Sequence, residues 1–336
     1  MRELNLNNKM KEMKRVAVVT SGGDVPGLNA AIRAVTRTAL ARGVRVVGVQ
    51  RGYEGLIAGD FVELTSKDVA GVLRRGGTIL GTSRSERFMT EEGRLAAKAQ
   101  LEHAGIDGLV VIGGNGTLAG ANALYKLGFP LVGVPKTIDN DQHGTDTAIG
   151  VDTALNTIAD AVGRIKDTAS SHRRAFLVEV MGRRCGYLAL ASGIICGAEM
   201  VLIPEHPATP DEVAHRIIEV SHIGKAHCII IVAEGWSPGL RALQHYLLTN
   251  HVEEGFDVRE VVLGHVQRGG TPTAFDRLLA TRMGARAVES LLDGSGIGHM
   301  VGLHGGQLGL VPLEVATAQP KPLSPELLHI ADVLCH

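Results

Sequence analysis

Short runs of apolar, β-branched residues alternate along this chain with longer segments of helical periodicity, and no other feature of the sequence constrains the fold as strongly. Strands that alternate with helices form parallel sheets that helices cover on both faces. At roughly 150 residues per domain, the 336 residues predict an α/β protein of two doubly wound, mostly parallel-sheet domains. A (β/α)₈ barrel is the alternative architecture. The strand-like runs lie at residues 15–20, 44–50, 109–112, 131–134, 175–180, 200–203, 228–233 and 261–263, and the helical patterns at 67–75, 91–104, 118–127, 211–221, 274–292 and 324–334.

The composition excludes several classes of protein. The chain has 34 Lys and Arg against 35 Asp and Glu, so it is not a generally basic nucleic-acid-binding protein. Aromatic residues make up only 3% of the chain, too few for a platform on which single-stranded bases stack. The four cysteines form no Cys-x-x-Cys pair, no apolar run approaches a membrane span, and the first 14 residues lack the apolar core of a secretory signal. We therefore expect a cytoplasmic protein that binds neither nucleic acid nor membrane.

Two glycine-rich segments follow strands and precede helices, at residues 21–27 (SGGDVPG) and 113–117 (GGNGT). Glycine lets backbone amides approach an anion closely, and the N-terminus of a helix adds partial positive charge. Open α/β sheets bind their ligands at such strand ends, which argues against the barrel. Each segment alone could be a plain tight turn, but the pair together predicts phosphate binding.

A further strand end carries the heptapeptide PKTIDND at residues 135–141. If this segment is extended, Asp139 and Asp141 point the same way. Two neighbouring carboxylates repel each other, so either one pKa rises or a metal ion lies nearby. Both outcomes suit a general base or a magnesium site. The alternative is a solvated acidic turn.

Arginines stand beside glycines at two more strand ends, Arg183 in VEVMGRR and Arg268 in GHVQRGG. Arginine can bind a phosphate through two parallel hydrogen bonds. Two glycine loops, a pair of carboxylates and several arginines together indicate phosphoryl transfer, whereas a hydride-transfer enzyme would not need so many arginines. Asp139 would then take the proton from an acceptor hydroxyl, and Arg183 would balance charge on the moving phosphoryl group.

At these clusters the sequence closely resembles the 6-phosphofructokinase family of the bacterial type, from about residue 15 to about residue 287. The matching stretches, in order, are TSGGDVPGLNAAIR, GTSR, VVIGGNGT, KTIDND, VEVMGR and GHVQRGG. The resemblance implies a glycolytic kinase that uses Mg²⁺ and transfers a phosphoryl group to the 1-hydroxyl of fructose 6-phosphate, giving fructose 1,6-bisphosphate. It also implies an active site in the cleft between two domains. The phosphoryl-donor (nucleotide) domain would comprise residues 1–150 and about 266–312, and the fructose 6-phosphate domain about 151–265 and 313–336.

Carried over one residue at a time, the resemblance assigns three sets of site residues. The catalytic set is Asp139 as the base, with Thr137, Asp141 and Arg183 around the transferred group. The sugar-phosphate set is Arg174, Met181, Gly182, Glu234, Arg259, His265 and Arg268. The phosphoryl-donor set is Gly23, Tyr53, Arg84, Gly114, Asn115, Gly116, Thr117 and Lys136. In the family, the residues that match Arg174 and Arg259 reach in from a neighbouring subunit, which implies a homo-oligomer, either a tetramer or a dimer.

Three positions bear on the choice of phosphoryl donor. The familiar ATP-dependent bacterial enzymes have Asp where this chain has Asn115, and that Asp helps to hold magnesium, so the candidate metal ligands here are Asn115 and Asp141. Those enzymes have Gly in place of Lys136, and Lys there resembles the pyrophosphate-dependent branch. That branch, however, has Asp in place of Gly116, where a carboxylate would crowd and repel the α-phosphate of ATP. Gly116 leaves that space open, so the sequence favours ATP.

Three other functions remain open at the level of sequence. The first is a pyrophosphate-dependent phosphofructokinase. The second, a NAD or lipid kinase, would share the glycine-rich loop but would not explain GHVQRGG or VEVMGR. The third, a degenerate ligand-binding paralogue, fits Asn115, whereas the intact Asp139, Asp141 and Arg183 argue against it.

Regulated bacterial relatives bind ADP or phosphoenolpyruvate at a separate site between subunits. In this chain Lys166 and Ser66 stand where the family has Arg, and Gly71 stands where it has Asp. We therefore expect a vestigial effector site and a weak or absent response to either effector. The residues that match this site are Arg33, Arg37, Lys166, Glu199 and Lys225.

Overall fold

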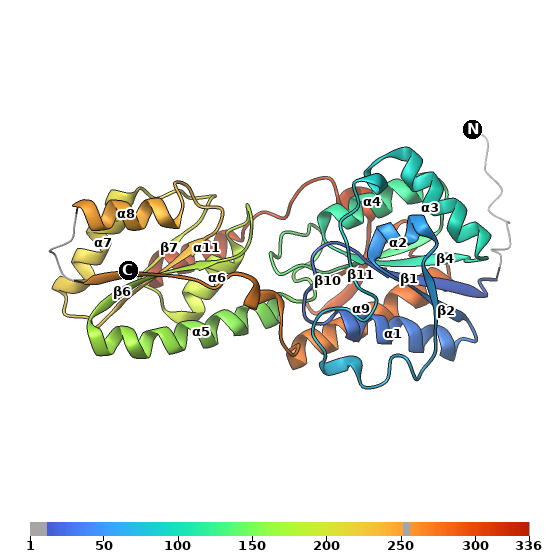
Figure 1. The fold of residues 1–336 in the computed structure, drawn as a ribbon, viewed down its shortest axis with the longest axis horizontal. Helices are drawn as coiled ribbons and strands as arrows, with labels where there is room; N and C mark the ends of the chain where they lie inside the picture. Colours follow the sequence, from blue (N-terminus) through green and yellow to red (C-terminus); the bar gives the residue numbers. More distant parts are fainter. Residues whose placement is uncertain (1–11, 251–255, 336) are drawn as a thin grey trace. The chain divides into compact units, whose positions relative to one another are not determined.

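The computed structural model describes residues 12–250 and 256–335 of the chain. The chain forms two compact units and passes between them several times (Figure 1). Unit 1 comprises Met1–Lys136, Gln142–Asp146 and Arg277–Gln319, and unit 2 comprises Thr137–Asp141, Thr147–Asp276 and Pro320–His336. Each unit is a mostly parallel sheet with helices, which confirms the predicted fold class.

Within the described residues, unit 1 has one seven-stranded sheet in the order β11-β10-β5-β4-β1-β2-β3. The strands from β10 to β2 run parallel, while β11 and β3 pair antiparallel at the two edges. Because this sheet is open at both edges, it is not a (β/α)₈ barrel. Its strands are β1 (Arg15–Thr20), β2 (Arg45–Val49), β3 (Phe61–Leu64), β4 (Gly108–Gly113), β5 (Leu131–Pro135), β10 (His299–His304) and β11 (Gln307–Pro312).

Helices cover both faces of this sheet, as the fully buried strand β4 requires (Figure 1). On one face, α2, α3 and α4 contribute Leu56, Leu101 and Leu118 to the core. On the other face, α9 packs closely on α1. Gly284 of α9 allows this approach, because a Cβ there would lie only 2.8 Å from the carbonyl oxygen of Ala31 on α1. The helices of this unit are α1 (Leu28–Ala41), α2 (Gly52–Ala58), α3 (Glu91–His103), α4 (Asn115–Lys126), α9 (Ala274–Leu292) and α10 (Leu313–Ala316), with the 3₁₀ turns η1 (Val72–Arg74) and η2 (Arg87–Met89).

Unit 2 has, in its described part, a four-stranded parallel sheet in the order β7-β8-β6-β9. Helices α7 and α8 contribute Val213, Ile217 and Leu243 to a core that includes Leu177 and Ile230 of the strands. The strands are β6 (Arg174–Val180), β7 (Met200–Leu202), β8 (Cys228–Ala233) and β9 (Asp257–Val262), and the helices are α5 (Val151–His172), α6 (Tyr187–Cys196), α7 (Pro210–His222), α8 (Leu240–Asn250) and α11 (Pro325–Leu334), with the 3₁₀ helix η3 (Gly264–Arg268).

Two helices of unit 2 begin at strong local signals. At α7, the Thr209 hydroxyl accepts from the N–H of Glu212 and the Glu212 carboxylate accepts from the N–H of Thr209, which is a capping box. Pro210 fills the first helical position, where no N–H is needed. At α11 the Ser324 hydroxyl accepts from the N–H of Leu327, and Pro325 follows it. These contacts confirm the helices that the sequence predicts there.

The helix predicted over residues 67–75 is wrong, because the structure has turns followed only by η1. The Asp68 carboxylate accepts hydrogen bonds from the N–H and the hydroxyl of Thr65, at 2.7 and 2.6 Å. The equivalent contact of Glu212 with Thr209 begins a helix at α7, so this contact does not by itself prevent one. Gly71, however, adopts a left-handed conformation with a φ of 70°, which a right-handed helix cannot include. The backbone at Gly71 therefore interrupts the helical spacing of this segment.

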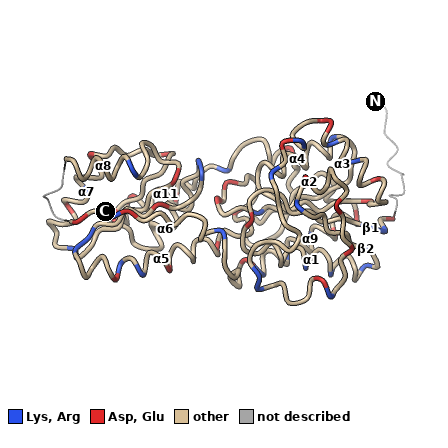
Figure 2. Tube along the Cα trace, in the orientation of Figure 1, with Lys and Arg blue, Asp and Glu red and all other residues tan. Residues whose placement is uncertain are grey.

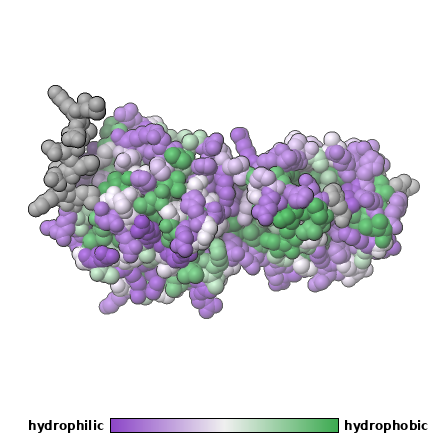
Figure 3. Space-filling view, turned by 180° about the vertical axis from the view of Figure 1, so that it is seen from behind, coloured by the Kyte–Doolittle hydropathy of each residue, from purple (hydrophilic) through white to green (hydrophobic). Residues whose placement is uncertain are grey.

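The surface agrees with the balanced composition. Charged residues of both signs are spread over both units (Figure 2). On the face drawn in Figure 3, hydrophobic areas are interrupted by hydrophilic ones. No helix in the described part of the chain is long and apolar enough to cross a membrane.

Candidate active site

Asp139 is a buried carboxylate of unit 2, with only 4% of the residue exposed. Its Oδ2 lies 4.0 Å from Nε of Arg183. No described residue hydrogen-bonds to its Oδ1, which is a buried acceptor left unsatisfied. Burial above all raises the pKa of Asp139, and the negative charge of Asp141 raises it further. The positive charges of Arg268 and Arg183 oppose this shift of the pKa, and the charge of Glu234 adds to it.

The backbone around Asp139 sets the direction of its side chain. The N–H of Thr137 donates to the carbonyl oxygen of Ile149 at 3.1 Å, and the N–H of Asp139 donates to Oγ1 of Thr137 at 3.0 Å. Asn140 has a φ of 51°, so the segment turns there instead of running extended. Asp141 nevertheless lies close enough for its charge to act on Asp139.

The loop after β6 presents Arg183 in a left-handed backbone conformation. Gly182 has a φ of 140° and Arg183 a φ of 54°. Oε1 of Glu234 holds this turn, because it accepts from the N–H groups of Gly182 and Arg183 at 3.2 and 2.5 Å. A Cβ at Gly182 would lie 2.4 Å from the carbonyl oxygen of Cys185, so only glycine fits. The result is an exposed Arg183 side chain beside the buried Asp139.

The 3₁₀ helix η3 carries two more of the predicted residues, of which Arg268 lies near enough to act on Asp139. Arg268 is half-buried, and its charge lowers the pKa of Asp139. His265 is exposed on the same short helix. The N–H of Met181 donates to Oε1 of Gln267 at 3.2 Å, which joins η3 to the loop after β6. Unit 2 therefore gathers Thr137, Asp139, Asp141, Met181, Gly182, Arg183, Glu234 and Arg268, with His265 on η3.

Arg174 and Arg259 lie apart from this group. β6 runs from Arg174 to Val180, so about 20 Å of strand, at about 3.3 Å per residue, lies between Arg174 and the start of the loop that carries Arg183. Arg259 pairs in register with Phe176, in the first half of β6. Both arginines bind Asp257, with Nε of Arg174 at 3.2 Å and Nη2 of Arg259 at 2.7 Å from its Oδ2. Unit 2 by itself does not bring these two arginines to the carboxylate of Asp139.

In unit 1 the two predicted glycine loops lie against each other. Oγ1 of Thr117 donates to the carbonyl oxygen of Ser21 at 3.1 Å, and Nζ of Lys136 donates to that of Gly23. A Cβ at Gly22, which has a φ of 82°, would lie 3.1 Å from Oγ1 of Thr117 and 3.5 Å from Nζ of Lys136. The structure thus brings Gly23, Thr117 and Lys136 of the predicted phosphoryl-donor set to one place.

Helix α4 begins at the second glycine loop, with Gly114 as its N-cap and Asn115 as its first residue. A Cβ at Gly113 would lie 2.2 Å from the side chain of Thr117, so only glycine fits at this position of the loop. A Cβ at Gly116 would meet no described atom within 4 Å. The first turn of α4 therefore has free space in front of a helix N-terminus, which suits a phosphate group.

Tyr53 and Arg84, also assigned to the phosphoryl donor, differ in exposure. The ring of Tyr53 is buried and stacks on Phe88, with the ring centroids 3.7 Å apart. Its hydroxyl donates to the carbonyl oxygen of Thr117 at 2.6 Å, and burial raises its pKa far above the usual value. Tyr53 therefore supports the second loop from inside the core, and its contact with a phosphoryl donor stays a prediction. Arg84 is exposed.

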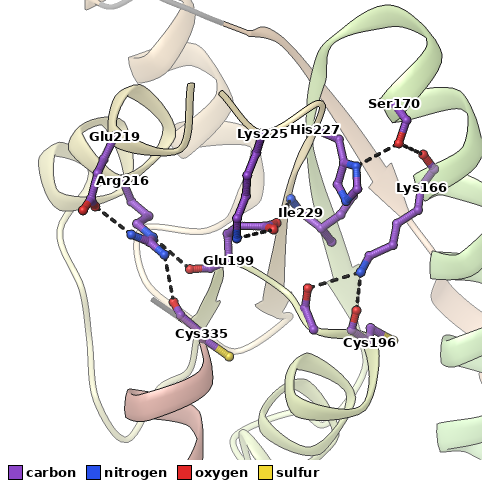
Figure 4. A network of polar contacts seen from close by, with 11 residues as sticks. Lys166, Ser170, Cys196, Glu199, Arg216, Glu219, Lys225, His227, Ile229 and Cys335 are labelled. Atoms are coloured by element: carbon purple, nitrogen blue, oxygen red, sulfur yellow. Dashed lines mark hydrogen bonds and ion pairs between the residues drawn. The ribbon is translucent and has the colours of Figure 1, made fainter. Parts of the chain in front are cut away.

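The residues matched to an effector site are divided between the two units. Arg33 and Arg37 lie on α1 of unit 1. Lys166 lies on α5 of unit 2, where its Nζ donates to the carbonyl oxygens of Cys196 and Gly197 at the end of α6 (Figure 4). A cation at the C-terminal end of a helix is stabilised by the helix dipole. Lys166 therefore already has partners within its own chain.

Glu199 is buried and also has partners within unit 2 (Figure 4). Its carboxylate accepts from the N–H of Ile229 at 2.6 Å and from Nζ of Lys225 at 3.2 Å. The backbone carbonyl of Glu199 accepts from Nε of Arg216 at 3.1 Å, and Nη2 of Arg216 donates to the carbonyl oxygen of Cys335. An effector phosphate would have to compete with these contacts for Lys166 and Lys225.

Two polar residues shape the site through contacts that the sequence does not indicate. Gln267 lies in the GHVQRGG motif, but nothing in that motif shows that its side chain is fully buried and holds the loop after β6. Glu205 accepts from the N–H of Gly186 with both carboxylate oxygens, at 2.9 and 3.1 Å. Glu205 therefore holds the C-terminal end of the loop after β6, and it lies in a stretch of sequence that contains no motif.

Comparison with known proteins identifies the family. A buried carboxylate beside arginines in one unit, and paired glycine loops in the other, suit a phosphoryl-transfer protein. The family model described as Phosphofructokinase matches residues 15–291, and the chain belongs to this family. It is 53% identical to the ATP-dependent 6-phosphofructokinase of Thermotoga neapolitana over 325 residues, which is 96% of this chain and 100% of the relative. It is 51% identical to the ATP-dependent 6-phosphofructokinase 1 of Thermus thermophilus over 323 residues, 96% of this chain and 99% of the relative.

Solved structures support the same fold. The phosphofructokinase of Pichia pastoris in the T-state superposes with a TM-score of 0.84 at 40% identity, over 92% of this chain and 36% of the much longer yeast chain. The pyrophosphate-dependent phosphofructokinase of Marinobacter aquaeolei superposes with a TM-score of 0.82 over 94% of this chain and 86% of that chain. Its identity of 21% makes it a likeness of fold alone.

Proposed function

We infer that this chain transfers the terminal phosphoryl group of ATP to the 1-hydroxyl of fructose 6-phosphate, which is the glycolytic activity of the ATP-dependent 6-phosphofructokinases that it is similar to. The observation that carries the inference is the buried Asp139, whose Oδ1 has no hydrogen-bond partner among the described residues. A coupled assay for fructose 1,6-bisphosphate, run with the purified chain, fructose 6-phosphate and ATP, tests it. Absence of product would overturn it.

Asp139 would act as the general base. The proton of the 1-hydroxyl would pass to the carboxylate of Asp139 as the hydroxyl oxygen attacks the γ-phosphorus, and ADP would leave. The raised pKa supports this role, because a carboxylate that holds a proton more tightly accepts one more readily. Arg183, whose Nε lies 4.0 Å from Oδ2 of Asp139, would balance charge on the phosphoryl group in transit.

The acceptor sugar phosphate would bind to the residues that surround Asp139 in unit 2. Arg268 and His265 on η3 would bind the non-reacting phosphate, since both side chains can donate to an anion. Gly182 and Glu234 would position the sugar, and Thr137 would support the catalytic segment. Unit 1 would bind the phosphoryl donor through its two glycine loops. The expected cleft between the two domains and the cytoplasmic location stay predictions.

Mg²⁺ is the metal that the family implies, and the residues of unit 2 fit it. The negative charge of Asp141 raises the pKa of Asp139, and a cation beside Asp141 would offset this repulsion between the two carboxylates. Mg²⁺ commonly binds to one or two carboxylates together with phosphate oxygens of a substrate. Asp141 would hold the ion, and the positive charge of Mg²⁺ would neutralise the negative charge of the ATP phosphates. Asn115 as a second ligand stays a prediction.

ATP is the phosphoryl donor that the first turn of α4 favours. The open space at Gly116 leaves room for a further phosphate of a nucleotide. Lys136 resembles the pyrophosphate-dependent branch, but its Nζ already donates a hydrogen bond to the carbonyl oxygen of Gly23. The two relatives at 53% and 51% identity are both described as ATP-dependent. Pyrophosphate remains the second candidate on the strength of Lys136 alone.

A homo-oligomer would account for the position of Arg174 and Arg259. Both lie away from the catalytic carboxylate of their own unit and share the partner Asp257, so they would serve a neighbouring copy. Val262 and Val266, at and after the end of the edge strand β9, are 58% and 62% exposed, as expected for a surface that a second copy covers. The choice between a dimer and a tetramer stays open.

Mixing two inactive variants tests this sharing of residues. Arg174→Ala and Asp139→Asn are each expected to have little activity, because each lacks one half of the site. After subunits are exchanged, hybrid oligomers would contain sites that take Asp139 from one copy and Arg174 from the other, so activity is expected to return in part. If the mixture stays as inactive as its components, Arg174 does not act across subunits.

Regulation by ADP or phosphoenolpyruvate is expected to be weak. Lys166 cannot form the two parallel hydrogen bonds of an arginine, and its Nζ is already bound by backbone carbonyl oxygens of α6. Loss of a charge-assisted contact of this kind costs about tenfold or more in affinity. The saturation curve for fructose 6-phosphate is therefore expected to stay near-hyperbolic with millimolar phosphoenolpyruvate present. A strongly sigmoidal curve that ADP relieves would contradict this expectation.

A further inference from the structure

Gln267 is the fully buried residue of η3, with 0% of its surface exposed. Both ends of its side-chain amide are used. Oε1 accepts from the N–H of Met181 at 3.2 Å, and Nε2 donates to the carbonyl oxygen of Gly264 at 3.0 Å. One contact reaches the loop after β6 and the other closes η3 on itself. Gln267 is therefore a direct link between two segments that are far apart in the sequence.

Side chains hold the loop after β6 where its strand pairing ends. Strand β6 ends at Val180, and the next three N–H groups all donate to side chains. That of Met181 goes to Gln267, and those of Gly182 and Arg183 go to Glu234. Because Arg183 has an unfavourable positive φ, the loop keeps this shape only while its surroundings impose it.

The geometry of η3 separates the role of Gln267 from that of its neighbours. In a 3₁₀ helix, residues three apart lie on the same side. His265 and Arg268 therefore share one side of η3, while Gln267 between them is turned into the core. The residue that anchors η3 is not one of those that would bind the sugar phosphate.

We propose that Gln267 is a positioning residue of the acceptor site, whose buried amide holds the loop Met181–Arg183 and η3 at a fixed spacing so that both bind one sugar phosphate. This inference rests on the proposed function, which assigns the loop and η3 to fructose 6-phosphate. Glu234 positions the same loop but would also contact the sugar, whereas Gln267, being fully buried, acts only through other residues.

Gln267→Met is the variant that tests the proposal. Methionine keeps the length and most of the volume of glutamine but removes both hydrogen bonds, and it leaves the Met181 N–H without an acceptor. The KM for fructose 6-phosphate is expected to rise about tenfold, the cost of one buried polar group that loses its partner. The KM for ATP is expected to change less than about twofold, a difference too small to reflect the loss of a contact, because the residues assigned to ATP belong to unit 1.

Gln267→Glu supplies the rescue. A glutamate side chain retains an oxygen that can accept from the Met181 N–H but loses the N–H that donates to Gly264. Its KM for fructose 6-phosphate is expected to lie between those of the wild type and Gln267→Met, and calorimetric affinities for fructose 6-phosphate should follow the same order. If Gln267→Glu is as impaired as Gln267→Met at a pH low enough to keep the buried carboxyl neutral, so that no charge is buried, the contact with Met181 is not what matters, and the proposal fails.

Two controls keep the outcomes distinct. Leu243→Ala removes a fully buried side chain from the core under α8 and should lower the melting temperature of the protein without a selective rise in the KM for fructose 6-phosphate. If Leu243→Ala and Gln267→Met raise the KM for fructose 6-phosphate by the same factor, Gln267 has only a structural role.

Arg268→Ala is the second control, and it tests the assignment of the site itself. If Arg268→Ala raises the KM for fructose 6-phosphate and Gln267→Met does not, the inference about Gln267 fails and the proposed function stands. If neither variant raises this KM, the assignment of η3 to the sugar phosphate fails.

Discussion

Asp139→Asn is expected to lower kcat by about 10²–10⁴-fold, the usual contribution of a general base. The amide keeps the shape of the carboxylate but cannot accept the proton of the 1-hydroxyl. The KM for fructose 6-phosphate should change much less, because Arg268 and His265 would still bind the phosphate. The measurement is a steady-state assay with saturating ATP over a range of fructose 6-phosphate concentrations, together with a melting curve to show that the variant is folded.

Asp160→Asn is the matched control for this experiment. Asp160 is an exposed aspartate on α5 of the same unit, and it pairs with Arg164 on the surface at 3.0 Å. An exposed pair of this kind contributes little to stability, so kcat should stay near the wild-type value. If Asp139→Asn retains more than about a tenth of the wild-type kcat, Asp139 is not the base, since that loss is well below the range for general-base catalysis.

Gly116→Asp is expected to raise the KM for ATP by at least about tenfold, through repulsion between a carboxylate and a phosphate in the space that Gly116 leaves open. The fold should tolerate the change, because a Cβ at Gly116 would meet no described atom within 4 Å and an acidic residue in the first turn of a helix is favourable. The KM for fructose 6-phosphate should stay close to that of the wild type. Steady-state kinetics with each substrate varied in turn measure both effects.

Gly116→Ala separates charge from bulk at the same position. Alanine adds a methyl group without charge, so its KM for ATP should rise much less than that of Gly116→Asp. Equal effects of the two variants would show that crowding rather than repulsion acts at this position. An unchanged KM for ATP in Gly116→Asp would show that the phosphates of ATP do not approach the first turn of α4.

The fold class could be predicted because its signal is local and repeated. Buried parallel strands need continuous apolar runs, and residues 109–112 and 228–233 are such runs in β4 and β8. The predicted helix at 67–75 failed because Gly71 adopts a left-handed φ of 70°, a backbone conformation that helical periodicity does not reveal. The antiparallel edge pair β10 and β11 went unpredicted, since its residues are only partly buried in β11 and follow no clear alternation.

The candidate site could be predicted as far as its residues lie within short motifs. Asp139 and Arg183 each belong to a motif, and the structure places them 4.0 Å apart. What the sequence could not reveal are contacts between distant segments. Gln267 and Met181 are 86 positions apart, and neither belongs to a pattern that would pair them. The separation of Arg174 from Arg183 also needed the structure, because it follows from the length and direction of β6.

The rate of fructose 1,6-bisphosphate formation with ATP, measured in parallel with the rate with pyrophosphate, tests the central claim most directly. The purified wild-type chain is assayed with fructose 6-phosphate and each phosphoryl donor, once with Mg²⁺ and once with Mg²⁺ removed by a chelator. We expect turnover with ATP and Mg²⁺ to exceed clearly that with pyrophosphate, and both to be lost when Mg²⁺ is removed. A faster reaction with pyrophosphate, or no fructose 1,6-bisphosphate with either donor, would contradict the account.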